Sequence, residues 1–154
     1  MTGTTRILML ASALMMTTSA NAQGQRSLTA DDLAEIHNLY AHYNLMLDGG
    51  DAEGWADTFV EDGSFGNNQG RSAIVAFAEG FIEANRNTRH WNTNIRITPS
   101  AEGAAGTAYL MLWNVGARPH SIVLTGTYED TLVETPDGWR FKSRRVRVDP
   151  AADG

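Results

Sequence analysis

Residues 120–148, HSIVLTGTYEDTLVETPDGWRFKSRRVRV, decide the fold expected for this chain. The turn segment TPDG divides the stretch into two long runs that we interpret as consecutive strands. The segments PSAEGAAG and VGARP divide the residues before it in the same way, so everything after Thr88 predicts sheet. The expected strands cover residues 88–98, 106–114, 120–134 and 138–148.

The residues before these strands predict helices. Thr29 is the expected N-cap of a first helix, and Asp32 completes a capping box. Apolar residues recur at helical spacing until the Gly-Gly pair at 49–50 ends this helix. Asp51 is expected to cap a second, short helix, the segment EDGSF to form a brief strand, and residues 71–85 to form a third helix.

This order of elements predicts the fold class. Three helices followed by four long, connected strands indicate an α+β domain, with the helices packed on one face of a curved, mostly antiparallel sheet. A curved sheet wrapped over helices leaves a cone-shaped barrel, and such a cone can hold a ligand.

The first 22 residues have the features of an export signal. Arg6 precedes the apolar run ILMLASALMM, and the small-residue site ANA ends at Ala22. We therefore expect a cleaved signal peptide over residues 1–22 and one mature domain over residues 23–154. The exported protein is expected in the periplasm if the source is a bacterium, with no membrane attachment after the signal is removed.

Composition excludes several classes of function. The formal charge of −6 becomes −7 without Arg6, which argues against nucleic acid as a partner. The chain has no cysteine, so thiol catalysis and cysteine metal sites are excluded. His37 and His42 are five residues apart, which is unsuitable for a shared metal ion on a helix, and no phosphate loop, G-x-S-x-G or H-E-x-x-H motif is present. We expect neither a metal nor a cofactor.

The segment NTRHWNTNIR contains the first candidate for chemistry. Strand alternation would place His90, Asn92, Asn94 and Arg96 together on one face of the sheet. Either this polar face is solvated and His90 is ordinary, or the face lines a cavity in which the histidine acts as a base.

Asp48 is the candidate partner of that histidine. An aspartate before two glycines is most often a turn residue. Alternatively, its carboxylate holds one imidazole nitrogen of His90 and makes the other nitrogen a better base. Trp55, Met111 and Trp113 are best explained as core or cavity lining, and each residue of this kind is more often plain core.

Four segments together carry a resemblance to a known family. They are EIHNLYAHYNLMLDGGDAEGWADTFVEDGSF, GRSAIVAF, RHWNTNI and GTYEDTLVETPDGWRFKSRRV. In this order and spacing they resemble the SnoaL-like family of the nuclear transport factor 2-like superfamily, over nearly the whole mature chain. The likeness is to the branch whose enzymes use an Asp/His dyad, such as hexachlorocyclohexane dehydrochlorinase, scytalone dehydratase and bile acid 7-alpha-dehydratase.

The resemblance implies a SnoaL-like, cystatin-like roll and assigns roles to residues. The family aspartate and histidine fall on Asp48 and His90, a family tyrosine on Tyr43, and the arginine that closes the pocket on Arg144, although the sequence does not decide between Arg144 and Arg145. The expected pocket wall consists of Trp55, Asn94, Met111, Trp113, Leu124 and Val146. Trp113 is bulkier than its counterpart in the dehydrochlorinase, which puts that particular substrate in doubt.

The implied activity is that of a cofactor-free lyase, of the dehydratase or dehydrohalogenase type, or of an isomerase, acting on a small apolar molecule. The alternative is a non-catalytic exported module on the same fold that binds a small ligand or takes part in assembly. A carboxylate-based hydrolase ranks lowest, because the strand segment AYLMLWN has no aspartate. The family also implies a homodimer or homotrimer.

Overall fold

The computed structural model describes residues 27–150, so the expected signal peptide lies outside the described residues. The helices are α1 (Ala30–Gly49), α2 (Ala52–Ala56) and α3 (Arg71–Ala84). The strands are β1 (Phe59–Phe65), β2 (Asn68–Gln69), β3 (Thr88–Ser100), β4 (Gly103–Asn114), β5 (Ser121–Thr135) and β6 (Gly138–Val148). None of the helices within residues 27–150 is long and apolar enough to cross a membrane.

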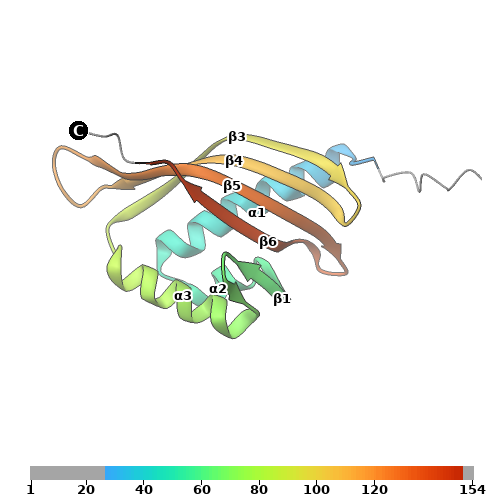
Figure 1. Cartoon of the computed structure of the whole chain (residues 1–154), viewed down its shortest axis with the longest axis horizontal. Helices are drawn as coiled ribbons and strands as arrows, with labels where there is room; N and C mark the ends of the chain where they lie inside the picture. The colour runs from blue at the N-terminus through green and yellow to red at the C-terminus, as the bar shows by residue number, and fades with distance from the viewer. Residues whose placement is uncertain (1–26, 151–154) are drawn as a thin grey trace, which may run out of the picture.

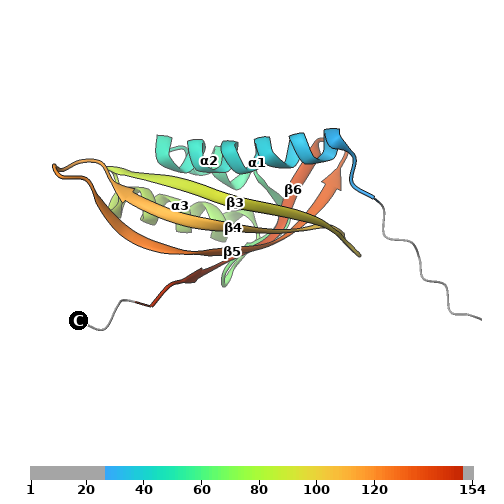
Figure 2. The same cartoon turned by 90° about the horizontal axis from the view of Figure 1, so that it is seen from above.

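The strands form one mixed, curved, open sheet in the order β2-β1-β6-β5-β4-β3. Strand β1 runs parallel to β6, and the other neighbouring pairs are antiparallel. Helix α1 lies along one face of this sheet, as both views show, while α2 and α3 pack near β1 at one end (Figure 1, Figure 2). The expected α+β architecture of helices on a curved, mostly antiparallel sheet is confirmed. We call the face that carries α1 the inner face and the opposite one the outer face.

The expected helix ends are also confirmed. Thr29 and Asp32 form the capping box, with the Asp32 amide donating to the Thr29 hydroxyl oxygen over 3.1 Å. Gly50 ends α1 in the left-handed conformation, with a φ of 83°. Asp51 caps α2 by accepting from the Gly54 amide over 2.8 Å.

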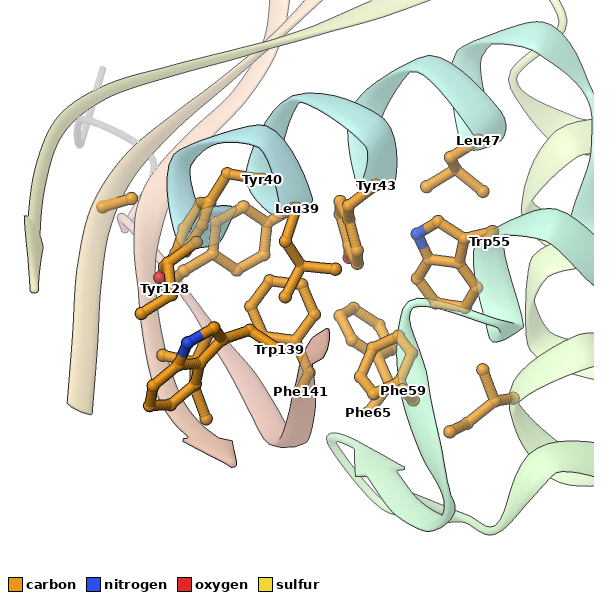
Figure 3. Close-up of a cluster of buried hydrophobic side chains, with 14 of the residues drawn as sticks. Leu39, Tyr40, Tyr43, Leu47, Trp55, Phe59, Phe65, Tyr128, Trp139 and Phe141 are labelled. Atoms are coloured by element: carbon orange, nitrogen blue, oxygen red, sulfur yellow. The ribbon is translucent and has the colours of Figure 1, made fainter. Parts of the chain in front are cut away.

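An aromatic core joins the helices to the sheet (Figure 3). Tyr43 of α1 packs edge-on against Phe141 of β6, with ring centroids 5.6 Å apart, and Trp55 of α2 lies 5.1 Å from Tyr43. These rings are fully buried. Because α1 and α2 share this core with β1, β5 and β6, the end of α1 is fixed in position against the sheet.

The simple alternation expected for residues 90–97 is wrong beyond Thr93. The β3–β4 register shifts between Thr93 and Arg96, and Asn94 takes a positive φ of 53°. This bulge reverses the faces that follow it: Arg96 pairs with the exposed Thr107, whereas Ile97 pairs with Gly106 and packs on the core.

Candidate functional site

A polar stripe on α1, formed by Tyr40, Asn44 and Asp48 at four-residue spacing, connects the helix to the inner face. Residues four apart lie one turn apart on the same side of a helix. Each member bonds a different side chain of the sheet: Tyr40 contacts Asp130, Asn44 contacts Asn92, and Asp48 contacts His90. The stripe therefore brings three polar contacts into one row.

The expected contact between Asp48 and His90 is formed. The His90 Nδ1 lies 2.6 Å from Asp48 Oδ1, and the His90 backbone amide donates to Asp48 Oδ2 over 2.9 Å. One carboxylate thus holds both the ring and the backbone of the histidine. The side chains are 4% (His90) and 11% (Asp48) exposed, so the pair is largely removed from water.

This arrangement decides which histidine nitrogen is available. A carboxylate accepts hydrogen bonds, so Nδ1 carries the proton and the lone pair is left on Nε2. Nε2 forms no hydrogen bond with any residue from 27 to 150, and the Phe81 ring lies 5.5 Å from the imidazole. Asp48 is in the last turn of α1, so the end of this helix positions the carboxylate against the imidazole. The pair can act as a general base.

The second contact is an amide pair. Asn44 Nδ2 donates to Asn92 Oδ1 over 2.7 Å. The remaining atoms, Asn44 Oδ1 and Asn92 Nδ2, are buried and have no hydrogen-bond partner within the described chain. The pair has one free acceptor and one free donor.

The third contact contains the predicted arginine. Arg144 donates from Nε and Nη2 to the two oxygens of Asp130 over 2.8 and 2.7 Å, and the Tyr40 hydroxyl also bonds Asp130. Both charged side chains are 0% exposed. Arg144 pairs with Asp130 across β5 and β6, whereas Arg145 pairs with Glu129 and therefore points to the outer face. Arg144, and not Arg145, is the inward arginine.

Aromatic rings surround the guanidinium group. The Arg144 Cζ lies 4.2 Å from the ring centroids of both Tyr43 and Tyr128. Burial opposes its charge, but the adjacent Asp130 carboxylate outweighs this and raises the pKa of Arg144. The group is a fixed buried cation, and its Nη1 has no hydrogen-bond partner among residues 27–150.

Two buried phenols lie against this cation. Burial and the neighbouring Tyr128 hydroxyl raise the pKa of Tyr43, and burial raises the pKa of Tyr128 to about 12. The Asp48 carboxylate is among the charges that raise the pKa of Tyr128, which places this phenol within electrostatic reach of the dyad. Both phenols therefore stay protonated at neutral pH.

The predicted pocket-wall residues fall into three groups. Leu124 and Val146 lie on the inner face, half-buried against the core. Trp55 is completely buried within the aromatic cluster (Figure 3). Asn94 is exposed at the bulge, so its predicted place on the pocket wall is wrong: the positive φ interrupts the alternation that had placed it beside His90.

The predictions for Met111 and Trp113 are also wrong. His90 pairs with Leu112, so strand alternation puts Leu112 on the inner face and its two neighbours on the outer face. Trp113 packs there on Trp91, with ring centroids 5.2 Å apart. Met111 lines a hollow of about 470 Å³ on the outer face, together with Trp91, Thr93, Tyr109, Leu110, Thr125, Gly126, Thr127 and Asp149.

Sequence reasoning missed Asn44 and Asp130 as members of the site, and it placed Asn92 on the face of His90 without assigning it a role. The four-residue spacing of Tyr40, Asn44 and Asp48 was a usable signal for the first of these. The partner of Arg144 could not be identified, because it depends on the register of β5 against β6.

Comparison with known proteins defines the family. The chain belongs to the SnoaL-like domain family, which it matches over residues 28–145. It is similar to a candidate scytalone dehydratase from Novosphingobium aromaticivorans, with 30% identity over 80% of this chain and 88% of the other and a TM-score of 0.68. ActVI-ORFA from Streptomyces coelicolor is 29% identical over 79% of this chain and 98% of its own, with a TM-score of 0.70.

The chain is also similar to a protein that is one subunit of a larger enzyme. The small subunit of anthranilate 1,2-dioxygenase from Burkholderia cepacia is 26% identical, over an alignment that covers 75% of this chain and 85% of the relative. The predicted SnoaL-like family is thus confirmed, and its members similar to this chain include proteins named as enzymes or enzyme subunits of small-molecule metabolism.

Proposed function

We propose that this protein is a cofactor-free lyase, of the dehydratase or dehydrohalogenase type, or an isomerase, and that its substrate is a small, largely apolar molecule. The observation that carries this proposal is the Asp48–His90 contact, in which a buried carboxylate holds Nδ1 and leaves Nε2 free. The likeness to a candidate scytalone dehydratase supports it.

In the proposed reaction His90 Nε2 takes a proton from a substrate carbon. The electron pair of the broken C–H bond forms a C=C double bond as hydroxide or halide leaves the neighbouring carbon with its own bonding pair. Asp48 stabilises the imidazolium that results. If no group leaves, the proton returns at another carbon and the reaction is an isomerisation.

Arg144 and Tyr43 are proposed to stabilise the negative charge that develops during this step. Their side chains are fully buried, so Arg144 acts as a fixed positive charge held by Asp130, and Tyr43 as a protonated phenol beside it. Charges fixed before the reaction stabilise a transition state without reorganisation cost.

The test is turnover of small hydroxylated and halogenated alicyclic compounds by the mature protein, followed by product analysis. We expect loss of the elimination product in His90→Ala, by roughly 10²–10⁴-fold, as is typical for removal of a general base. Leu45→Ala, a change at an exposed site on α1, is the matched control and should retain activity. Unchanged turnover in His90→Ala would contradict the proposal.

The second candidate is a binding or assembly module. The observation that favours it is the similarity to a dioxygenase small subunit. A binding module would return its ligand unchanged after incubation, whereas a lyase would return product, so the same incubation distinguishes the two.

Two further proposals concern the state of the protein. We propose export with removal of residues 1–22, which N-terminal sequencing of the secreted protein would test by a start at Gln23. We also propose a homodimer or homotrimer formed through the outer face, where Trp91 of the edge strand β3 and Tyr109 of its neighbour β4 are 56% and 54% exposed.

A further inference from the structure

Of the three contacts made by the polar stripe, the two outer ones contain at least two hydrogen bonds each, and the middle one contains a single hydrogen bond. Asp48 holds His90 by two hydrogen bonds, and Asp130 is bonded by both Tyr40 and Arg144. Two primary amides facing each other can form two hydrogen bonds, but Asn44 and Asn92 form only one.

The unpaired atoms of the middle contact are a matched set. Asn44 Oδ1 is an acceptor and Asn92 Nδ2 is a donor, and both are buried without a partner in the described part of the chain. Leaving buried polar groups unpaired costs free energy, so their presence beside a candidate catalytic pair calls for an explanation. A hydroxyl group can donate to the first atom and accept from the second, whereas a halogen substituent cannot donate.

The amide pair is close to the base. Asn44 precedes Asp48 by one helical turn, which separates their Cβ atoms by about 5–6 Å. Asn92 follows His90 by two strand residues on the same face, a separation of about 7 Å. The amide pair and the Asp48–His90 pair are therefore neighbours on the same two elements, α1 and β3.

We propose that Asn44 and Asn92 form a hydroxyl-binding subsite that orients the substrate beside His90, and that the substrate is an alcohol rather than an apolar halide. This inference rests on the proposed function and names the substrate class of the same site. Both asparagines are half-buried while their two free atoms are buried, so the proposal requires the amide groups to rotate when a ligand binds. They are specificity residues and take no part in proton transfer.

The competing explanation is structural. The single hydrogen bond ties α1 to β3, and on that view the free atoms have no ligand. The two explanations differ in one measurable property, because only a subsite discriminates a hydroxylated ligand from an equally shaped one that lacks a donor.

The experiment measures the dissociation constants of cyclohexanol and chlorocyclohexane with the ¹⁵N-labelled full chain by NMR titration. The ratio of the two constants is compared between wild type, Asn44→Leu and Asn92→Leu, which cancels the difference in hydrophobicity between the probes. We expect the ratio to shift toward chlorocyclohexane by about threefold to tenfold in each variant, the usual worth of one or two hydrogen bonds. In the wild type, cyclohexanol should shift the side-chain amide signals of both residues, and chlorocyclohexane should not.

Asn94→Gly is the matched control, since Asn94 is two residues further along β3 but exposed at the bulge. An unchanged ratio in both leucine variants, an equal change in Asn94→Gly, or amide signals that ignore cyclohexanol would overturn the subsite. The side-chain amide signals of the wild type test the subsite even if a leucine variant does not fold. In His90→Ala the ratio of the two dissociation constants should stay at its wild-type value. Loss of turnover in that variant therefore bears on the proposed function and not on the subsite.

Discussion

Asp130 holds Arg144 through two parallel hydrogen bonds, from Nε and Nη2, in a place where neither side chain is exposed. In a buried ion pair, the attraction and the hydrogen bonds between the two groups offset the free-energy cost of removing both charges from water. Loss of one partner therefore leaves an uncompensated charge in the core.

The first prediction follows from this pair. Asp130→Ala should lower the free energy of unfolding by about 3–5 kcal/mol, the usual cost of breaking a buried pair from one side. The double variant Asp130→Leu/Arg144→Met should be more stable than Asp130→Ala, because it removes both charges. Urea unfolding of the three proteins measures this, and a double variant less stable than the single one would contradict it.

The second prediction concerns the tautomer of His90. Because Asp48 accepts from Nδ1, the ¹⁵N spectrum of the imidazole should show a protonated Nδ1 and an unprotonated Nε2. In Asp48→Asn the amide can donate as well as accept, so the tautomer ratio should shift toward protonated Nε2. His120, outside the helices and strands and exposed, is the internal control. The same ratio in both proteins would show that Asp48 does not control the ring.

The third prediction concerns alkaline pH. An unfolded tyrosine ionises near pH ~10, whereas burial raises the pKa of Tyr128 to about 12. The native state therefore keeps a proton that the unfolded state has lost, so the stabilisation is complete below pH ~10 and falls as pH rises toward ~12, by about 1.4 kcal/mol per pH unit for each such group.

Tyr128→Phe should flatten this decline in the free energy of unfolding above pH ~10. The matched control is Tyr109→Phe, whose ring is largely exposed on the outer face. Denaturant titrations between neutral and alkaline pH provide the measurement. Equal slopes in wild type and Tyr128→Phe would show that the phenol is not held protonated by the fold.

The fourth prediction concerns the bulge. Asn94 has a φ of 53°, a conformation that costs little for asparagine or glycine and about 1–2 kcal/mol for other residues. Asn94→Gly should leave stability nearly unchanged, and Asn94→Val should lower it by about 1–2 kcal/mol. Thermal unfolding of both variants tests this, and an equal effect of valine and glycine would argue against the bulge.

That bulge also shows where sequence reasoning stopped. Capping signals, helical periodicity and turn segments were sufficient to predict α1, α3 and the four long strands within a few residues, because these features are local. The position of one extra residue in β3 depends on its pairing with β4, and no local signal marked it. The error moved Asn94 to the wrong side of the sheet.

The site was likewise predictable only in part, because some of its contacts depend on strand pairing. The contact of Asp48 with His90 was proposed from the family resemblance, and the structure shows it. The resemblance placed the pocket arginine on Arg144 without deciding between Arg144 and Arg145. The bonding of Arg144 to Asp130 was not predicted, because it depends on strand register. Met111 and Trp113 were misplaced because a resemblance transfers residue positions and not the face of the sheet to which each side chain points.

The last prediction concerns this outer face. Trp91 and Tyr109 are more than half exposed there, beside the half-buried Met111 and Trp113, so strands β3 and β4 present an unusual amount of apolar surface. If the face joins copies of the chain, sedimentation should give a dimer or trimer for the wild type and a monomer for Trp91→Asp. Leu45→Asp is the matched control: Leu45 is 66% exposed but lies on α1, away from this face, and should not change the assembly. A monomeric wild type would contradict the proposed homo-oligomer, and dissociation of both variants would show that added charge, and not the outer face, was responsible.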